Sequence, residues 1–274
     1  MSEPFSLLLP VYAADDPAHF TRAFDSSVRD QTRAPSEVVL VQDGPIGTEL
    51  DRAVRQAIAT AAVPVVHEVL IENVGLARAL ELGLARAAHE IVARMDADDV
   101  SLPERFERQL PVIEAGADLV GSGMLEFLDD DGLIVGRRVP RVGAAEIERY
   151  ARFHDPFNHP TVVYRRSAVV RAGGYQPLGR MEDYWLFARM IHTGAAVENL
   201  AEPLLMYRVG AGAYTRRGGW EQWRSELALQ RALRSIGFTS RWQAMRNLGI
   251  RGAYRFVPER IRRSAYRRFI AAGG

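Results

Sequence analysis

The sequence contains neither cysteine nor lysine. Because none of its 274 residues is a cysteine, disulfide bonds and thiolate metal sites are excluded. All 35 basic residues are arginines. P-loop nucleotide triphosphatases, protein kinases and Schiff-base enzymes each need a lysine amine at the active site, so the absence of lysine excludes them.

Long hydrophobic runs are also missing. No stretch of about 18 apolar residues occurs, so no membrane-spanning helix is predicted. The first twelve residues lack a basic leader followed by a long apolar stretch, and they indicate no signal peptide. We therefore expect a cytoplasmic protein. Its hydrophobic fraction of 47% is ordinary for a globular chain with a full core.

Charge is distributed unevenly along the chain. The net charge is only +1, yet residues 216–274 contain fourteen Arg and three Glu. Residues 1–215 contain twenty-one Arg and thirty-one acidic residues. The basic C-terminal part reads as amphipathic helices with Arg on one side and Trp, Phe or Leu on the other, a pattern that fits an anionic membrane surface. An ordinary solvated helical face with dimer contacts is the alternative, and a homodimer is compatible with it.

Apolar runs alternate with helical patterns in the first hundred residues. Strands are predicted at 6–12, 37–44, 65–71 and 90–96, and the segments between them have helical spacing. This alternation predicts an α/β fold with a mainly parallel sheet flanked by helices. In such sheets, ligands bind beyond the carboxyl ends of the strands. We therefore expect the polar residues that follow each strand to converge at one edge.

The run IVARMDADDVSLPERF, residues 91–106, places three carboxylates where a buried strand ends. Ser101 and Glu104 have the spacing of a capping box for the next helix, with Pro103 in its first turn. Asp96 and Asp98 are then not needed as caps. Two carboxylates on the same side of an extended chain repel unless a cation lies between them, and oxygen ligands suit Mg²⁺ or Mn²⁺. A solvated turn is the alternative.

The second half of the chain has a different pattern. Residues 118–140 predict two strands joined by an Asp-Asp-Asp-Gly turn, and further strands are predicted at 159–166 and 200–209. Between these strands, a Gly-rich loop leads into a helix that begins near Glu182.

Several motifs together resemble glycosyltransferase family 2, and in particular the subgroup typified by the amylovoran-biosynthesis glycosyltransferases. They are PVY, VVLVQDG, ENVGLARALELGL, ARMDADDVSLPERFERQ, PFNHPTVVYRRSAV and GGYQ…MEDYWLFARM. The resemblance covers about residues 4–215. It implies a GT-A (Rossmann-like) domain over 1–215, divided into a nucleotide-binding half (1–100) and an acceptor-binding half (101–215). Residues 216–274 would form a basic helical extension.

The resemblance also implies roles for individual residues in binding the donor. Asp43 would bind the base, although a turn former is the alternative for this residue. Asp96 and Asp98 would form a D-x-D motif, with Asp96 nearer the ribose and Asp98 on the metal. The full set of nucleotide-sugar-binding residues would be Pro10, Val11, Tyr12, Asp43, Asn73, Arg78, Asp96 and Ala97.

On the acceptor side, the resemblance implies that Asp183 is the general base and that Glu182 supports it. His159 and Trp185 are candidates for acceptor binding. Each has a simpler alternative: Asp183 could be a helix N-terminal charge, His159 a buried hydrogen-bonded histidine, and Trp185 a packing residue. Many relatives carry a histidine after the last strand near the diphosphate. Here the segment YRVGAGAYTRR has none, and Arg208, Tyr214, Arg216 and Arg217 are the candidates to replace it.

The function implied is inverting, metal-dependent transfer of a sugar from a nucleotide diphosphate. The donor would be a UDP-hexose, with dTDP-rhamnose or a GDP-sugar as alternatives. The acceptor would be a polyprenyl-diphosphate-linked or other glycolipid in exopolysaccharide or O-antigen synthesis. Residues 216–274 would place the enzyme peripherally on the inner face of the plasma membrane.

Functions of other classes fit the sequence less well. Arg with interleaved Trp and Tyr could bind nucleic acid, but no nucleic-acid-binding signature accompanies them. A nucleotidylyltransferase would need a catalytic lysine. A non-catalytic scaffold is disfavoured by the intact Asp96, Asp98 and Asp183.

Overall fold

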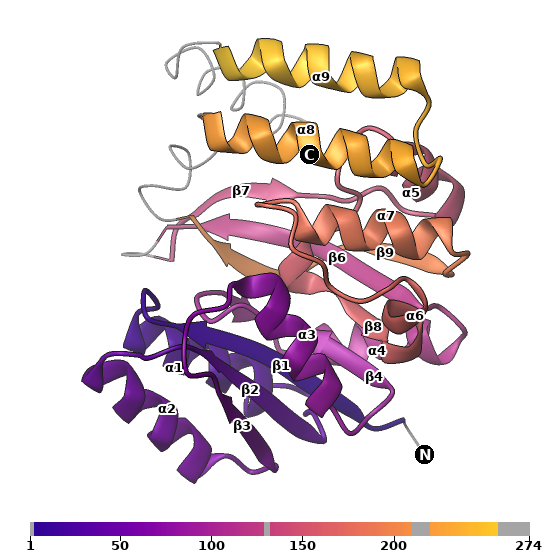
Figure 1. Cartoon of the computed structure of the whole chain (residues 1–274). Coiled ribbons are helices and arrows are strands. Elements are labelled where there is room, and N and C mark those ends of the chain that lie inside the picture. The colour runs from indigo at the N-terminus through magenta and orange to yellow at the C-terminus, as the bar shows by residue number, and fades with distance from the viewer. Residues whose placement is uncertain (1–2, 129–131, 210–219, 257–274) are drawn as a thin grey trace.

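A computed structural model describes residues 3–128, 132–209 and 220–256. Within these residues, nine strands form one sheet with helices on both faces (Figure 1). The elements are β1 (Phe5–Tyr12), α1 (Pro17–Val28), β2 (Glu37–Asp43), α2 (Thr48–Thr60), β3 (Val65–Val69), α3 (Leu76–Arg86), β4 (Ile91–Arg94), β5 (Val100–Ser101), α4 (Arg105–Glu114), β6 (Leu119–Phe127), β7 (Ile134–Arg138), α5 (Ala144–Ala151), the 3₁₀ helix η1 (His159–Thr161), β8 (Val163–Arg165), α6 (Arg166–Arg171), α7 (Glu182–His192), β9 (Val197–Arg208), α8 (Trp220–Ser235) and α9 (Arg241–Phe256).

The first half confirms the predicted alternation of strands and helices. Its strands pair in the order β3-β2-β1-β4, and every pair is parallel. Successive residues of a strand point to opposite faces, so Leu7 and Leu9 of β1 pack in the core that contains α1 and α2, whereas Leu8 packs in the core that contains α3. Both faces of β1 and β2 are thus buried, which explains their uninterrupted apolar sequence.

Helix α3 lies unusually close to the sheet because it carries a glycine. A Cβ atom at Gly83 would lie 2.3 Å from Leu8 Cδ1 and 2.7 Å from Val41 Cγ2. Any larger residue would therefore push α3 away from β1 and β2. Since α3 begins at the edge where the strands end, its position also sets the wall of the cavity described below.

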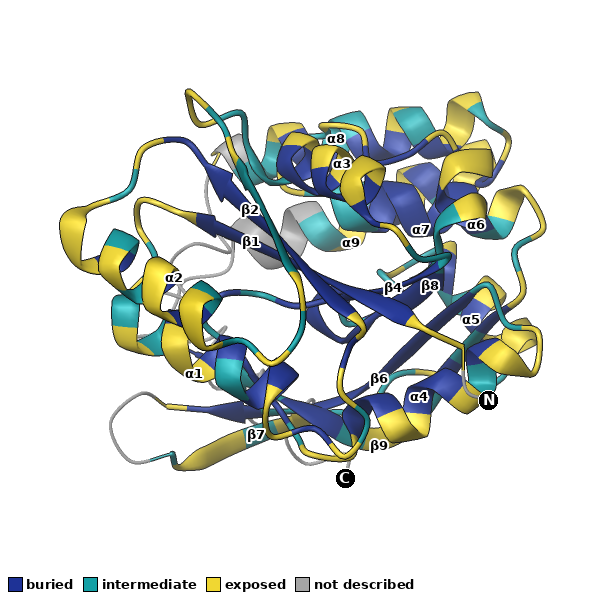
Figure 2. Cartoon of the chain, turned by 90° about the horizontal axis from the view of Figure 1, so that it is seen from below, coloured by how far each residue is buried: buried dark blue, intermediate teal, exposed yellow. Residues whose placement is uncertain are grey.

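In the second half the sheet becomes mixed. Strand β8 pairs antiparallel with β4 and β6, while β6 runs parallel to β9, and β7 pairs antiparallel with β6 as predicted for a hairpin. Figure 2 shows β7 as a largely exposed strand at the margin of the molecule. The tip of the hairpin, residues 129–131, lies outside the described residues.

Two predictions about local structure were wrong. The strand predicted at 159–166 is only three residues long, because η1 occupies its first part, where Pro160 has no N–H to donate to a neighbouring strand. The predicted capping box does not form: Ser101 lies in β5 opposite Leu205, and α4 begins only at Arg105. Tertiary pairing with β9 overrides the local capping signal there.

At the end of the molecule opposite α1 and α2, α8 packs on α7 and α9 packs on α8 (Figure 1). Leu229 and Leu233 of α8 join Tyr184 and Trp185 of α7 in one apolar cluster. The predicted domain boundary near residue 215 lies outside the described residues, as do 257–274. Among the described helices, none combines the length and the hydrophobicity needed to cross a membrane.

Candidate active site

Two neighbouring cavities open at the edge where the parallel strands end. The smaller, of about 540 Å³, we call the strand-end cavity; it is lined by Pro10, Val11, Tyr12, Asp15, Asp43, Asn73, Gly75, Leu76, Ala79, Asp96, Ala97, Asp98, Tyr207 and Arg208. The larger, of about 920 Å³, we call the hairpin cavity; it is lined by Leu76, Arg94, Asp96, Met124, Arg137, Arg138, Val139, Pro140, Arg141, Tyr150, Asp155, Pro156, Phe157, Asn158, His159, Pro160, Glu182, Asp183 and Tyr207. Leu76, Asp96 and Tyr207 line both, so the two cavities meet at Asp96.

The strand-end cavity collects almost all residues predicted to bind the nucleotide sugar. Residues 10–12, Asp43, Asn73, Asp96 and Ala97 come from four different strand ends, and all line it. Arg78 is exposed in the first turn of α3 and does not line either of these two cavities.

Asp43 is built into the floor of this cavity. Its Oδ1 accepts a hydrogen bond from the N–H of Val74 at 2.7 Å, and its Oδ2 accepts one from the N–H of Gly75 at 3.0 Å. Gly44 follows with φ +87°, and a Cβ there would lie 2.6 Å from the Asn73 nitrogen. Asp43 therefore holds the loop after β3 in place, and each of its oxygens retains a lone pair for a ligand.

Asp96 is tied to a buried arginine. Arg94 donates to Asp96 Oδ2 at 2.7 Å through Nη1, and its Nη2 forms a second, short contact with Oδ1. The Arg94 side chain is 2% exposed and that of Asp96 is 27% exposed. Because both oxygens of Asp96 face one guanidinium, its charge is already balanced before any ligand binds.

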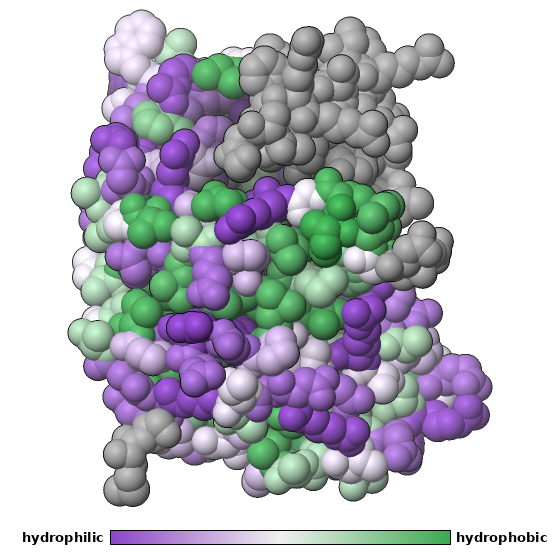
Figure 3. All heavy atoms as spheres, turned by 180° about the vertical axis from the view of Figure 1, so that it is seen from behind, coloured by the Kyte–Doolittle hydropathy of each residue, from purple (hydrophilic) through white to green (hydrophobic). Residues whose placement is uncertain are grey.

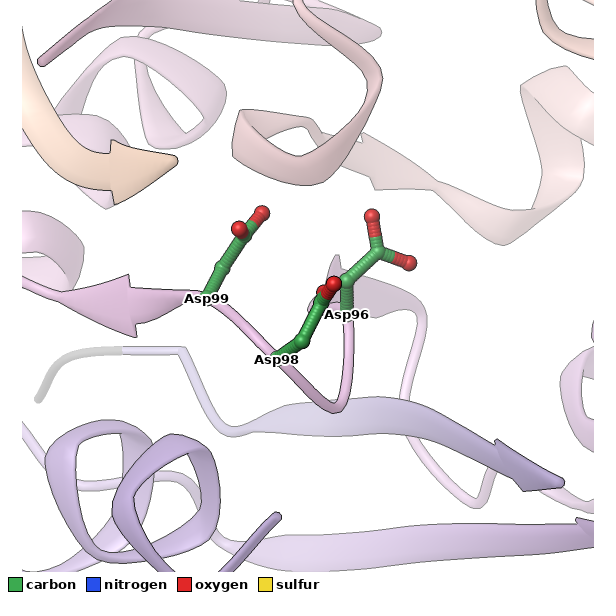
Figure 4. A group of neighbouring side chains, drawn as sticks. All are labelled: Asp96, Asp98 and Asp99. Atoms are coloured by element: carbon green, nitrogen blue, oxygen red, sulfur yellow. The ribbon is translucent and has the colours of Figure 1, made fainter. Parts of the chain in front are cut away.

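Asp98 and Asp99 carry charge that is less well balanced. One oxygen of each of Asp96, Asp98 and Asp99 lies within 4.8 Å of the others, and Figure 4 shows the three side chains projecting to the same side of the loop. Asp99 is fully buried; its Oδ1 accepts from the Arg208 N–H at 2.9 Å, while its Oδ2 has no partner in the part of the chain that the structure describes. Burial, together with the neighbouring Asp96, raises the pKa of Asp98 to about 6. Burial, together with Asp98, raises the pKa of Asp99 well above its usual value.

These acids fit a hard divalent cation. Such an ion prefers carboxylate oxygens, and a buried carboxylate oxygen without a partner is the kind of group that an ion would satisfy. On this geometry Asp98 and Asp99 are better placed as ligands than Asp96, whose oxygens are held by Arg94. The sequence analysis named Asp98 and Asp96 as metal ligands, and the structure adds Asp99 as a third candidate.

Asp15 is a further acid that sequence reasoning missed. It lines the strand-end cavity, and its Oδ2 accepts from the Tyr12 N–H at 2.9 Å. Burial raises its pKa to about 7, and the charges of Asp98 and Asp96 add to this shift. Its position in an Asp-Asp-Pro turn before α1 was a signal only for helix capping, which Asp16 provides.

In the hairpin cavity, a second group of acids surrounds the N-terminus of α7. Asp183 lines the cavity, and its pKa is raised by burial. Burial and the charge of Asp183 raise the pKa of Glu182 to about 7, and no described residue forms a hydrogen bond with Glu182 Oε2. Asp155, which the sequence analysis did not single out, also lines the cavity, and its pKa is raised well above the usual value by burial and by Asp183.

His159 is a buried residue that also forms part of the wall of the hairpin cavity. It lines the hairpin cavity, but it is also buried, and its Nε2 lies 3.1 Å from the Tyr175 hydroxyl. Its Nδ1 lies 3.9 Å from Asp183 Oδ2. Burial and the nearby Arg94 lower its pKa well below the usual value, so the ring is neutral beside the acid.

The Trp185 side chain packs against α8 and does not line the hairpin cavity. It is 8% exposed, packs with Leu229 and Leu233 of α8, and donates from Nε1 to Gln176 Oε1 at 3.0 Å. It does not line either of the two cavities, so its position does not support the predicted contact with an acceptor.

Of the four candidates to replace the missing histidine, Arg208 is the one that the structure describes. It lines the strand-end cavity and donates from Nε to the Asp98 carbonyl at 2.7 Å. Its guanidinium lies 4.6 Å from the centre of the Phe127 ring. Tyr214, Arg216 and Arg217 lie outside the described residues.

Together, the two cavities have groups that can bind a cation, hold a planar ligand and transfer a proton. The strand-end cavity has carboxylates suited to a cation and a polar floor suited to a planar ligand. The hairpin cavity has carboxylates whose raised pKa values suit proton transfer near neutral pH. Asp96 lies where a ligand in one cavity would contact a ligand in the other.

Comparison with known proteins agrees with this geometry. Residues 6–174 match the family described as Glycosyl transferase family 2. The chain is 38% identical over 242 residues to the amylovoran biosynthesis glycosyltransferase AmsE of Erwinia amylovora, a match that covers 85% of this chain and 88% of the relative. It is 29% identical over 271 residues to the UDP-Gal:alpha-D-GlcNAc-diphosphoundecaprenol beta-1,3-galactosyltransferase of Escherichia coli, covering 97% and 96%.

Among solved structures, residues 1–349 of Staphylococcus aureus TarS in complex with UDP-GlcNAc superpose with a TM-score of 0.67 at 16% identity. This match covers 98% of this chain and 76% of that one. It confirms the predicted GT-A fold. The match to the family over more than half of the chain, and the identity to AmsE along most of it, confirm the resemblance seen in the sequence: the chain belongs to glycosyl transferase family 2, and it is a glycosyltransferase.

Proposed function

We propose that the chain transfers a sugar from a nucleotide-diphosphate donor in the strand-end cavity to a hydroxyl of an acceptor in the hairpin cavity. One observation carries this proposal: the two cavities meet at Asp96, with metal-type carboxylates on one side and proton-accepting carboxylates on the other. A sugar attached to a nucleotide in the first cavity would thus face an acceptor in the second.

The donor is proposed to be a UDP-hexose. The galactosyltransferase relative names UDP-Gal as its donor, and the TarS structure contains UDP-GlcNAc. The base would lie against Asp43 and Tyr12, and the diphosphate would lie toward Asp98 and Arg208. The donors dTDP-rhamnose and GDP-sugars are the alternatives that the test below separates.

A divalent cation, Mn²⁺ or Mg²⁺, would be held by Asp98 and Asp99, with Asp96 completing the D-x-D motif. When bound, it would neutralise the charge of the nucleoside diphosphate leaving group. The chain itself contributes positive charge beside the same group through Arg208, whose Nε is fixed on the Asp98 carbonyl.

Asp183 is proposed to be the general base. The acceptor hydroxyl would attack the anomeric carbon from the face opposite the nucleotide, and its proton would pass to the Asp183 carboxylate. The new carbon–oxygen bond forms as the bond to the diphosphate breaks, so the configuration inverts in one displacement. Neutral His159 at 3.9 Å and Glu182 on the same helical turn would orient and tune that carboxylate.

The acceptor is proposed to be a glycolipid in the synthesis of a bacterial surface polysaccharide. One relative is named for amylovoran biosynthesis, and the name of the galactosyltransferase includes a diphosphoundecaprenol-linked sugar. Exposed Trp242 and Met245 on α9, together with the arginines of the extension, support peripheral contact with an anionic membrane.

Thermal-shift binding with UDP-, GDP- and dTDP-sugars, with and without Mn²⁺, tests the donor site. A ligand that binds only the folded state raises the melting temperature. We expect a Mn²⁺-dependent shift with UDP-sugars that is lost in Asp98→Ala and retained in the distant surface variant Arg52→Gln. The absence of a shift with any nucleotide would contradict the proposal and favour a binding protein without a donor.

A further inference from the structure

The segment that follows the β6–β7 hairpin tip exposes many aliphatic side chains. Residues 132–142, which we call the β7 segment, contain Leu133, Ile134, Val135, Val139 and Val142, each between 39% and 57% exposed. Figure 3 shows hydrophobic surface gathered on the face seen from behind, on the side where β7 runs. Scattered exposed apolar residues are ordinary, but five within eleven residues along one edge form a patch.

This patch lies on an open strand. Within the described residues β7 pairs only with β6. An edge strand with exposed aliphatic residues invites aggregation unless something covers it, and edge strands usually carry charges to prevent this. The β7 segment does carry charges, but they are gathered at its C-terminal part.

Three arginines of the β7 segment line the hairpin cavity, and their charges are balanced differently. Arg138 pairs with the buried Glu126 and lies over the Tyr207 ring. Arg137 and Arg141 have no carboxylate partner among the residues that the structure describes, although Arg141 lies over the Tyr150 ring. The cavity therefore has two uncompensated cations on one wall.

The other wall of the hairpin cavity is acidic, so the two walls suit different parts of one ligand. Asp155, Glu182 and Asp183 line it where the acceptor hydroxyl would lose its proton. An anion would be repelled there and attracted to Arg137 and Arg141. The planar guanidinium binds phosphate oxygens in pairs, so two arginines suit a phosphate or diphosphate ester.

We propose that the β7 segment binds the diphosphate-linked lipid part of the acceptor. Arg137 and Arg141 bind the diphosphate, and the exposed aliphatic residues beginning with Ile134 and Val139 contact the start of the hydrocarbon chain. This proposal rests on the proposed function, since it places the acceptor sugar between the arginines and Asp183. It assigns the acceptor's charged linkage to β7 instead of to the C-terminal extension.

The charges of Arg137 and Arg141 and the exposed aliphatic residues both fit a diphosphate-linked lipid. A free sugar would need neither feature. A soluble phosphate would need the arginines and leave the aliphatic residues exposed to water. A ligand in which a phosphate or diphosphate adjoins a hydrocarbon chain uses both, and the diphosphate-linked acceptor is the one that also places a sugar near Asp183.

The test measures binding to the full chain in EDTA, so that a diphosphate bridged by a metal to the strand-end cavity does not contribute. Farnesyl diphosphate, farnesol and inorganic pyrophosphate are the probes. We expect farnesyl diphosphate to bind more tightly than the other two. The double variant Arg137→Gln/Arg141→Gln should weaken farnesyl diphosphate binding by at least about tenfold. Ile134→Ser/Val139→Ser should weaken farnesyl diphosphate but leave pyrophosphate unchanged.

The matched control is Arg52→Gln, an exposed arginine of α2 that pairs only with Glu49 in its own helix and should change nothing. Farnesyl diphosphate binding that neither double variant weakens, or that is no tighter than farnesol binding, overturns the proposal. Sedimentation with phosphatidylglycerol vesicles gives a second result. If the arginine variant loses vesicle binding but keeps farnesyl diphosphate binding, the segment contacts bulk membrane and the acceptor assignment is wrong. Failure of the donor site appears separately, in the nucleotide thermal shifts.

Discussion

The strand-end cavity and the hairpin cavity both contain clustered carboxylates, but they hold them differently. Asp43 accepts two backbone hydrogen bonds, Asp96 faces a buried arginine, and Asp99 accepts one backbone hydrogen bond. In the hairpin cavity, Glu182 keeps one oxygen without a partner among the described residues, and burial raises the pKa of both Glu182 and Asp183. Burial also raises the pKa of Asp98 and Asp99, so the two cavities differ in the partners that hold Asp43 and Asp96, and not in the pKa shifts.

The largest effect that this comparison predicts is on Asp183. Asp183→Asn keeps the size and the hydrogen bond of the side chain but cannot accept the acceptor's proton. We expect the transfer rate to fall by about 10²–10⁴-fold, the usual contribution of a general base. Rates of sugar transfer under saturating donor and acceptor measure it.

Two further measurements make the Asp183 test specific. Donor binding, measured by thermal shift, should stay within experimental error, because Asp183 does not line the strand-end cavity. Asp155→Asn on the same wall serves as the matched variant and should retain more activity. Near-normal turnover by Asp183→Asn would remove it as the base.

The next effect is on stability at the junction of the two cavities. Asp96→Asn leaves the Arg94 guanidinium buried without its counter-charge, and breaking such a pair typically costs about 3–5 kcal/mol. Because Asp96 is partly exposed, we expect a loss of stability of about 3 kcal/mol or less, measured by urea unfolding. The double variant Arg94→Met/Asp96→Asn should recover part of the loss. If the single and double variants are equally stable, the ion pair does not hold the junction together.

A third effect is on the pH dependence of transfer. A general base works only when ionised, so a raised pKa moves the acid side of the activity profile upward. With the pKa of Glu182 at about 7 and that of Asp183 also raised, we expect kcat/KM for the acceptor to fall as pH drops below about 7. In Glu182→Gln, a remaining loss of activity at low pH, with donor binding unchanged over the same pH range, assigns the profile to Asp183 and not to Asp98. A profile flat down to pH 5 would contradict the raised pKa values.

The raised pKa of Glu182 also affects the stability of the fold, but with the opposite pH dependence. Because the folded pKa of Glu182 lies above its ordinary value of 4.5, the folded state binds the proton more tightly. Its contribution to stability is present below that value and is lost as pH rises through about 7. Glu182→Gln should therefore raise the melting temperature at pH 8 and leave it nearly unchanged at pH 5. A change at pH 5 that is as large as the change at pH 8 would contradict this reasoning.

The two cavities also differ in how far the sequence could predict them. The strand-end cavity comes from successive strand ends, so the alternation of strands and helices was enough to bring Tyr12, Asp43, Asn73 and Asp96 together. Its details were not predictable: the sequence does not show that burial leaves an oxygen of Asp99 without a partner among the described residues, and Asp15 lies next to Asp16, which caps α1.

The hairpin cavity is assembled from segments far apart in the chain. Arg94, Arg141, Asp155 and Asp183 come from β4, the segment after β7, the loop before η1 and α7, and no local pattern places them on one cavity. The family resemblance indicated Asp183 and His159 but carried no information on the arginines. Ser101 failed as a predicted cap for the same reason, because strand pairing with β9 decided its structure.

The smallest predicted effect concerns Trp185, the residue on which the position in the fold and the sequence interpretation differ most. A tryptophan next to a catalytic acid suggests a platform for a sugar, yet the indole packs against α8 and its N–H is used by Gln176. Trp185→Phe should leave the acceptor KM unchanged and lower the stability by about 1 kcal/mol, because it removes one buried hydrogen bond and part of a ring. Kinetics with varied acceptor and urea unfolding measure the two quantities. An acceptor KM raised severalfold, with stability unchanged, would mean that the indole reaches the hairpin cavity during the reaction, and that α7 and α8 separate to let it do so.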